Sequence, residues 1–308
     1  MKKFCLLLYW MSLPFLIQAQ AIHLAGSSED ICMNPVFSPD GEKIAYTKAN
    51  YKGLLILDLV SNSIKQITDE DAAGFAFKWS SDSKSILSRV SKYENQKRYN
   101  AVKIFDVENG KSNLLTEYKT MMPYLPEWAN GDLEVFLPSK EGIEVYNTGK
   151  SKNVNSTKSE MHSYALHDKI ILHDFTTGKE QISTPIKNAD IINLTASPDG
   201  RKVAFEIIGG NMFSMNADGT GLIDLGKGNR PKWSFDGRKI IYMIAEDDGH
   251  TFTKSDIYSI NPDGLEKVNL TNTNDLIEMN PCFSPDGNSI TYDVFNDGSI
   301  YLMNLEQR

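Results

Sequence analysis

PVFSPDGEKIAYTK, at residues 35–48, decides the fold because close copies of it recur along the chain. Each copy combines an aromatic residue or its equivalent, a polar turn and a β-rich strand. The other copies lie at 77–90, 195–207, 231–244 and 281–294, with a shorter, degraded one at 126–137. In Ser38-Pro39-Asp40-Gly41 every residue suits its position in a tight turn, and glycine tolerates the positive φ at its end. Each copy therefore predicts a hairpin.

A second recurring hairpin follows each of these turns. Its first strand is apolar and ends in Asp or Asn, whose short side chain can hydrogen bond to the backbone of the next turn. LLILDLVSNSIKQIT (54–68) is a clear example. The strand-ending residues are Asp58, Asp106, Asn147, Asp174, Asn216, Asn261 and Asn304. Two hairpins per repeat give four strands, and self-similarity every roughly 40–50 residues indicates a repeat architecture.

These repeats predict an all-β protein, a β-propeller of six or seven blades with four-stranded antiparallel sheets. Six turn phrases but seven Asp- or Asn-ended strands are recognisable, and the strand count favours seven blades. The discrepancy lies at 124–190, where a three-stranded blade near 158–188 or one extra hairpin would explain the short spacing. The last repeat lacks a fourth strand, and residues 22–25 are predicted to supply it, closing the ring from the opposite terminus.

Residues 1–21 are predicted to be a secretory signal peptide, and residues 22–308 a single propeller domain. Two lysines precede an apolar run that ends at Ile17, and a small-residue cleavage site ends at Ala21. The apolar run is too short to span a bilayer comfortably. Cys5 stands at the start of this run and not at its end, which argues against a lipoprotein anchor.

The charge of the chain restricts its partners. The 308 residues carry a net charge of −8, which becomes about −10 once the two lysines of the signal peptide are removed. An acidic chain without a cluster of Lys and Arg is a poor binder of nucleic acids and anionic membranes. We therefore expect no nucleic-acid partner and no stable membrane insertion, and we expect a monomer.

The repeated phrases FSPDGxxIxY and IYxMNxDG resemble the WD40-like repeats of the TolB-like β-propeller family. The resemblance covers nearly all of 22–308 and is weak between 118 and 188. It is specific at 34–70, 190–226, 230–272 and 279–308. It implies a secreted or periplasmic propeller that binds other proteins. Six blades are common in that family, which differs from the count above. The type member of the family has an extra N-terminal α/β domain that has no counterpart here. The role of the type member in the envelope is therefore not expected for this chain.

The innermost strand of each blade should line the central channel. Residues three and one positions before the strand-end aromatic share one face, because side chains alternate along a strand. The channel-lining candidates for binding are Asn34, Lys78, Glu127, Asn193, Thr195, Arg230, Lys232 and Asn280. Polar groups that converge on one axis can form a binding mouth. A water-filled channel is also polar without any ligand, so both interpretations stay open.

Three histidines lie close together in the sequence, at His162, His167 and His173, with Asp168 and Asp174 beside them. Histidine and carboxylate groups are common metal ligands. This spacing fits no recognised metal motif, however, and His167-Asp168 is typical of a turn between two strands. We therefore predict no metal and no cofactor.

Cys32 and Cys282 are the two cysteines outside the signal peptide, and an exported protein can form disulfides. Ring closure would make their repeats neighbours, so a disulfide between them is one alternative. Their positions relative to the strand-end aromatics differ by four residues, which is about 13 Å along a strand. This offset favours two small buried thiols.

Taken together, these features predict an exported, non-enzymatic propeller that acts as a binding scaffold in the bacterial envelope or periplasm. Its partner would be an envelope protein, a peptide or a glycan. The sequence contains no G-x-S-x-G nucleophile elbow. One alternative is a propeller enzyme such as a metal-dependent polysaccharide lyase, for which His162 and His173 would be the residues to test. Another is a structural surface component, which should self-associate.

Overall fold

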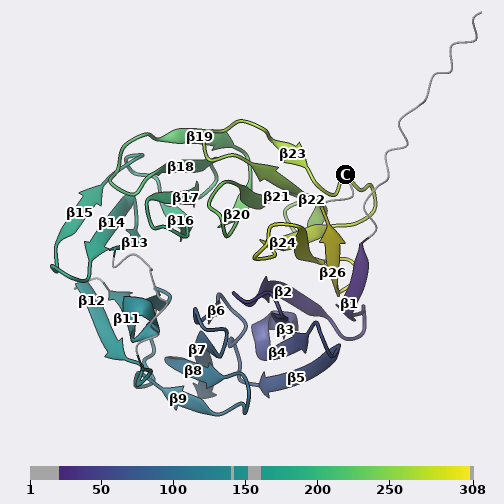
Figure 1. Cartoon of the computed structure of the whole chain (residues 1–308), viewed down its shortest axis with the longest axis horizontal. Coiled ribbons are helices and arrows are strands. Elements are labelled where there is room, and N and C mark those ends of the chain that lie inside the picture. Colours follow the sequence, from purple (N-terminus) through teal and green to yellow (C-terminus); the bar gives the residue numbers. More distant parts are fainter. Residues whose placement is uncertain (1–20, 140–141, 152–160, 306–308) are drawn as a thin grey trace, which may run out of the picture.

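The chain folds into seven antiparallel β-sheets arranged as blades around a central axis (Figure 1). This computed structural model describes residues 21–139, 142–151 and 161–305. The predicted signal peptide, apart from Ala21, lies outside the described residues. Within them, no helix is long and apolar enough to cross a membrane. The prediction of an all-β propeller is confirmed, and seven is the number of blades.

The blades are numbered in chain order, with strands given from the channel outward. Blade 1 contains β2 (Cys32–Phe37), β3 (Lys43–Lys48), β4 (Lys52–Asp58) and β5 (Ser63–Thr68). Blade 2 contains β6 (Lys78–Trp79), β7 (Ser85–Glu94), β8 (Lys97–Asp106) and β9 (Ser112–Leu114). Blade 3 contains β10 (Glu127–Ala129), β11 (Glu134–Ser139) and β12 (Gly142–Asn147), and blade 4 contains β13 (Met161–Leu166), β14 (Lys169–Asp174) and β15 (Glu180–Ser183).

The remaining blades have four strands each. Blade 5 contains β16 (Ile191–Ala196), β17 (Lys202–Ile207), β18 (Met212–Asn216) and β19 (Ile223–Gly226). Blade 6 contains β20 (Asn229–Trp233), β21 (Ile240–Asp247), β22 (Phe252–Ile260) and β23 (Val268–Asn269). Blade 7 contains β24 (Glu278–Phe283), β25 (Ser289–Val294), β26 (Ser299–Asn304) and, outermost, β1 (Ile22–Gly26). Two short 3-10 turns are η1 (Ala49–Tyr51) and η2 (Asn130–Asp132).

The recurring turn phrase forms a repeated hydrogen-bonded lock. In blade 1, Ser38 Oγ lies 2.5 Å from Asp40 Oδ1 and accepts from the backbone N–H of Lys43 at 3.0 Å. The same serine–aspartate contact, at 2.5 to 2.6 Å, recurs in blades 2, 5, 6 and 7. The serine hydrogen bond is the main cause that lowers the pKa of Asp199, Asp236 and Asp286. These residues therefore make the turn, as the sequence predicted.

Tryptophans on three innermost strands join neighbouring blades by hydrogen bonds. The indole N–H of Trp79 donates to the backbone oxygen of Val36 at 3.1 Å, and that of Trp233 to Thr195 at 3.1 Å. Trp128 donates in the same way to Lys78 at 3.2 Å. Each bond joins a blade to the one before it. Apolar clusters between adjacent blades supply the rest of the core, since each sheet buries both faces.

The ring is closed by the strand from the N-terminus, as predicted. β1 pairs antiparallel with β26, and Ile22 lies opposite Leu302. Gly26 has a φ of +92°, and a Cβ there would lie 2.3 Å from the backbone oxygen of Gly298, so only glycine fits. Beside this junction, Cys32 and Cys282 belong to one buried cluster and both are free thiols. The disulfide considered from sequence is therefore not formed.

Candidate binding site in the central channel

Four of the predicted channel residues share one unusual backbone conformation. Asn34, Asn193, Arg230 and Asn280 have φ values of 55°, 50°, 54° and 50°. Each lies within a register shift of its innermost strand, which is a β-bulge. Asparagine tolerates this left-handed region better than most residues, and Arg230 is the exception. The bulge re-aims the backbone and side chains at this level of the channel.

These bulges support a set of hydrogen-bonded side chains that we call the polar hub. Its members are Asn34, Asn193, Glu206, Arg230, Asn280 and Asp293. Asp293 Oδ1 accepts from the backbone N–H of Asn34 at 2.8 Å and from Asn280 Nδ2 at 2.9 Å. Glu206 accepts from Asn193 Nδ2 at 2.8 Å and from the backbone N–H of Arg230. The hub thus connects blades 5, 6, 7 and 1.

The ionisable groups of the polar hub are Arg230, Asp293 and Glu206. The Arg230 guanidinium donates to Asn280 Oδ1 and reaches the Tyr51 hydroxyl at 3.5 Å. Burial raises the pKa of Asp293 to about 6, although its hydrogen bonds from Asn280 and Asn34 oppose the shift. Lys232 lies beside the hub. Its ammonium nitrogen is buried with no hydrogen-bond partner among the described residues, and burial lowers its pKa. Here the predicted channel residues bond mainly to Asp293 and Glu206, two carboxylates that were not predicted as site residues.

The other three predicted residues, Lys78, Glu127 and Thr195, line a pocket of about 280 Å³. Lys78 and Glu127 form an ion pair between the innermost strands of blades 2 and 3. Thr195 faces them from β16 of blade 5. The pocket also includes Trp128, Asp132 and His162. We call this the channel pocket, and it is where the predicted residues converge on shared open space.

The channel pocket lies where blade 4 differs from its neighbours. The turn after β14 begins at Asp174, the equivalent of Asp58 and Asp106, which end the third strands of blades 1 and 2. β14 is therefore a third strand and β13 a second strand. The described residues of blade 4 thus include no innermost strand, and the pocket opens between the turns of blades 3 and 5.

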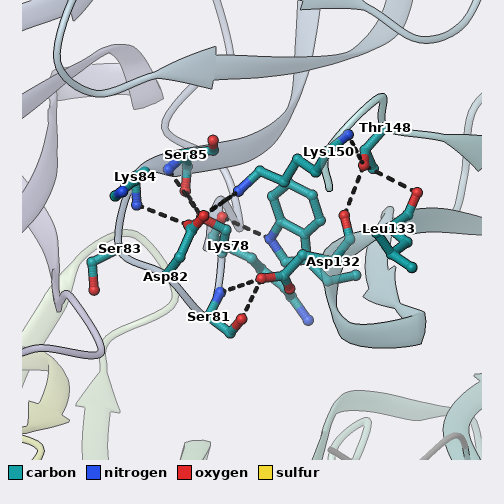
Figure 2. A network of polar contacts seen from close by, with 12 residues as sticks. Lys78, Ser81, Asp82, Ser83, Lys84, Ser85, Asp132, Leu133, Thr148 and Lys150 are labelled. Carbon is teal, nitrogen blue, oxygen red and sulfur yellow. Dashed lines mark hydrogen bonds and ion pairs between the residues drawn. The ribbon is translucent and has the colours of Figure 1, made fainter. Parts of the chain in front are cut away.

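Asp132 is the acidic group most deeply set in this pocket, at 3% exposure. Its Oδ2 accepts from the backbone N–H of Ser81 at 2.6 Å and from the Ser81 hydroxyl (Figure 2). Its Oδ1 is buried and has no hydrogen-bond partner in the described part of the chain, and the same holds for Ser163 Oγ. Buried polar atoms are normally satisfied, so an unpaired carboxylate oxygen and an unpaired hydroxyl beside one pocket favour binding of a ligand that can hydrogen bond to them.

The wall around Asp132 is held by contacts between blades 2 and 3. Lys150 Nζ lies 3.0 Å from Asp82 Oδ1 and 5.3 Å from the centre of the Trp128 ring. Figure 2 shows Lys150 and Ser81 reaching across the boundary from opposite directions. Asp132 and Trp128 were not among the predicted site residues. The sequence did carry one sign of Asp132. Asn130-Gly131-Asp132 stands where the other repeats have the serine–aspartate phrase, so this turn departs from the repeat.

The three histidines considered for metal binding are not brought together. His162 on β13 lies opposite His173 on β14, whereas His167 occupies the turn at the far end of this hairpin. His173 Nδ1 contacts Glu180 at 3.1 Å, and His167 Nδ1 contacts Asp190 at 3.3 Å. In the described parts of the chain, no group of three or more His, Cys, Asp or Glu side chains is placed to hold a metal ion.

Comparison with solved structures supports the fold. A putative TolB from Agrobacterium tumefaciens aligns with a TM-score of 0.53 at 17% identity, covering 90% of this chain and 91% of that chain. The β-propeller domain of Cps50 (Swd1) from Myceliophteria thermophila aligns with a TM-score of 0.58 at 11% identity, covering 93% and 100%. An oligogalacturonate lyase in complex with manganese aligns with a TM-score of 0.47 at 18% identity, covering 94% and 84%.

The first two likenesses confirm the propeller fold expected from the TolB-like repeats, and identities this low show the fold alone. No protein-family model matches the chain. No curated protein matches it either.

Proposed function

We propose that this chain is an exported, non-enzymatic propeller that binds a partner through the channel pocket. The observation that carries the proposal is the channel pocket, which opens where the described residues of blade 4 include no innermost strand, and which Asp132 and Ser163 line. The lining combines carboxylates, an ammonium group, a hydroxyl and an indole. Such a surface suits a small polar projection, for example a side chain or a sugar presented by an envelope protein, peptide or glycan.

Export rests on the N-terminal sequence, and the likeness to a putative TolB is compatible with a periplasmic location. Cleavage after Ala21 would leave Ile22 as the first residue, which begins the closing strand β1. Fractionation followed by mass spectrometry of the mature N-terminus tests this point. A full-length chain in the cytoplasmic fraction would contradict export.

The binding proposal is tested by blocking the channel pocket. Thr195→Arg introduces a long charged side chain at the pocket lining, and the Thr195 hydroxyl makes no hydrogen bond within the described residues that the substitution would remove. Proteins captured from envelope extract by the wild type should be lost with this variant, and the purified partner should bind wild type alone in calorimetry. Thr251→Arg is the matched control, because Thr251 is exposed in the hairpin between β21 and β22. Equal capture by all three proteins would refute the role of this pocket.

A further inference from the structure

A second cavity lies at the other end of blade 2. β7 and β8 have ten residues each, and their hairpin turns at Asn95-Gln96. Hairpins between second and third strands leave the sheet at the end opposite the serine–aspartate turns, because neighbouring strands are antiparallel. A cavity of about 320 Å³ opens there, between this hairpin and residues 120–123. We call it the hairpin pocket.

Two arginines, Arg89 and Arg98, line the hairpin pocket. The strand register places them on one face of the hairpin. Arg89 is opposite Val102 and Arg98 is opposite Tyr93, and paired residues share a face. Arg98 and Val102 also lie an even number of positions apart on β8, so all four side chains are on the same face. Arg89 donates to the backbone oxygen of Met122 at 2.8 Å, and its Nε is buried without a hydrogen-bond partner among the described residues. Arg98 Nε donates to Ser91 Oγ at 2.9 Å.

Neither arginine is neutralised. Within the described ranges, no carboxylate forms an ion pair with Arg89 or Arg98, whereas most of the ion pairs in the protein involve lysine. Glu94 is paired with Lys92 at 2.8 Å, and Glu144 with Lys119 at 2.9 Å. Burial and the positive charge of Arg98 both lower the pKa of Arg89. Two unneutralised guanidinium groups form a local positive site in a protein whose net charge is negative.

The rim of the hairpin pocket carries apolar side chains next to the exposed Thr120. Met121 is 75% exposed, and Pro123 is exposed beside it. Tyr93, at 61% exposure, lies directly across the strand pair from Arg98. Methionine adapts to varied partners, and exposed aromatic side chains next to arginine are common at binding surfaces. A cationic floor with an apolar rim matches a peptide in which an acidic residue is flanked by apolar ones.

We propose that the hairpin pocket binds an acidic peptide segment, with a carboxylate held by Arg89 and Arg98 and neighbouring apolar side chains packed on Met121 and Tyr93. The planar guanidinium fork matches a carboxylate in a bidentate manner. This site is separate from the channel pocket and lies toward the opposite end of the channel. Failure of either proposal therefore leaves the other standing.

Calorimetry with the mature protein and two blocked peptides tests this inference. The probe is acetyl-Leu-Glu-Leu-Glu-Leu-amide, and its neutral match carries glutamine in place of both glutamates. We expect the wild type to bind the acidic peptide at least about tenfold more tightly than the neutral one, which is the loss that follows removal of one charged hydrogen bond. Raising the salt from about 0.05 M to about 0.5 M should weaken binding, because exposed charge pairs are screened.

Arg98→Gln is the decisive variant, because Arg98 is exposed and its substitution leaves the apolar core intact. It should lose about tenfold in affinity for the acidic peptide. Arg201→Gln is the matched control, with a fully exposed arginine next to Asp199 in blade 5, and it should bind as wild type does. Equal affinity of Arg98→Gln and wild type, equal binding of both peptides, or no binding at about 5 mM peptide would each overturn the proposal.

Discussion

The indole N–H of Trp128 lies 3.2 Å from the backbone oxygen of Lys78 and donates a hydrogen bond to it across the boundary between blades 2 and 3. The same two residues line the channel pocket. One contact therefore both joins two blades and shapes the candidate site.

Trp128→Phe should keep most of the apolar contact and lose the hydrogen bond between the blades. We expect the free energy of unfolding to fall by about 1 kcal/mol, measured by urea denaturation. Trp233→Phe is the matched control, because Trp233 makes the same bond to Thr195 between blades 5 and 6. A similar loss in both variants supports the structural role, and no loss in either would contradict it.

Gly26→Ala should disrupt the closure of the ring. The added Cβ would lie 2.3 Å from the Gly298 oxygen, whereas a Cβ at Gly249, with a similar φ of +87°, meets nothing within 4 Å. Gly249→Ala therefore measures the backbone strain alone, about 1 kcal/mol. Gly26→Ala should lose at least about 1 kcal/mol more in chemical denaturation. Equal losses would show that this junction is not tight.

Asp293→Asn should change how stability depends on pH. Both hydrogen bonds of the Asp293 side chain reach Oδ1, and an asparagine oxygen can accept both. The folded pKa of about 6 lies above the ordinary value of about 3.9, so the folded state binds the proton more tightly than the unfolded state. Stability from this group is therefore full below about pH 4 and falls as the pH rises through about 6.

The wild type should accordingly lose about 2 to 3 kcal/mol relative to Asp293→Asn between about pH 4 and pH 7. Glu278, whose pKa burial raises to about 7, titrates in both proteins and cancels in the difference. Denaturation curves at a series of pH values give this difference directly. A constant difference across that range would mean that Asp293 is already ionised at acidic pH.

Lys232→Met should stabilise the protein. The ammonium nitrogen is buried without a hydrogen-bond partner in the described residues, and burial lowers its pKa. Removing an uncompensated buried charge while keeping a side chain of similar shape should raise the free energy of unfolding by about 1 kcal/mol or more. Lys202→Met, at an exposed position on β17, is the control. A loss of stability would show that attraction to Asp293 outweighs the cost of burial.

The repeats allowed the fold to be predicted because each carries its own turn chemistry. Ser38 and Asp40 form the same lock as Ser284 and Asp286, so five hairpins can be placed from sequence alone. The closing strand was predictable because the last repeat lacks its outer strand. The blade number depended on counting third strands such as β14, since the turn phrase is missing from blade 4.

The site was predictable only in part. Lys78, Glu127 and Thr195, which alternation along the strands singled out, share one pocket. Alternation could not show that Asn34, Arg230 and Asn280 lie in bulges, because a bulge shifts the side chains beyond it. Asp132 belongs to a turn that departs from the repeat, and its partner Ser81 lies in another blade. Contacts between blades are not encoded in any single repeat.

The pairing of Ile22 with Leu302 also determines when the ring of blades can close during synthesis. A ribosome releases Ile22 long before Leu302, so β1 stays unpaired in the nascent chain until β26 has been synthesised. Aggregation during biogenesis should therefore depend on how quickly the two termini meet.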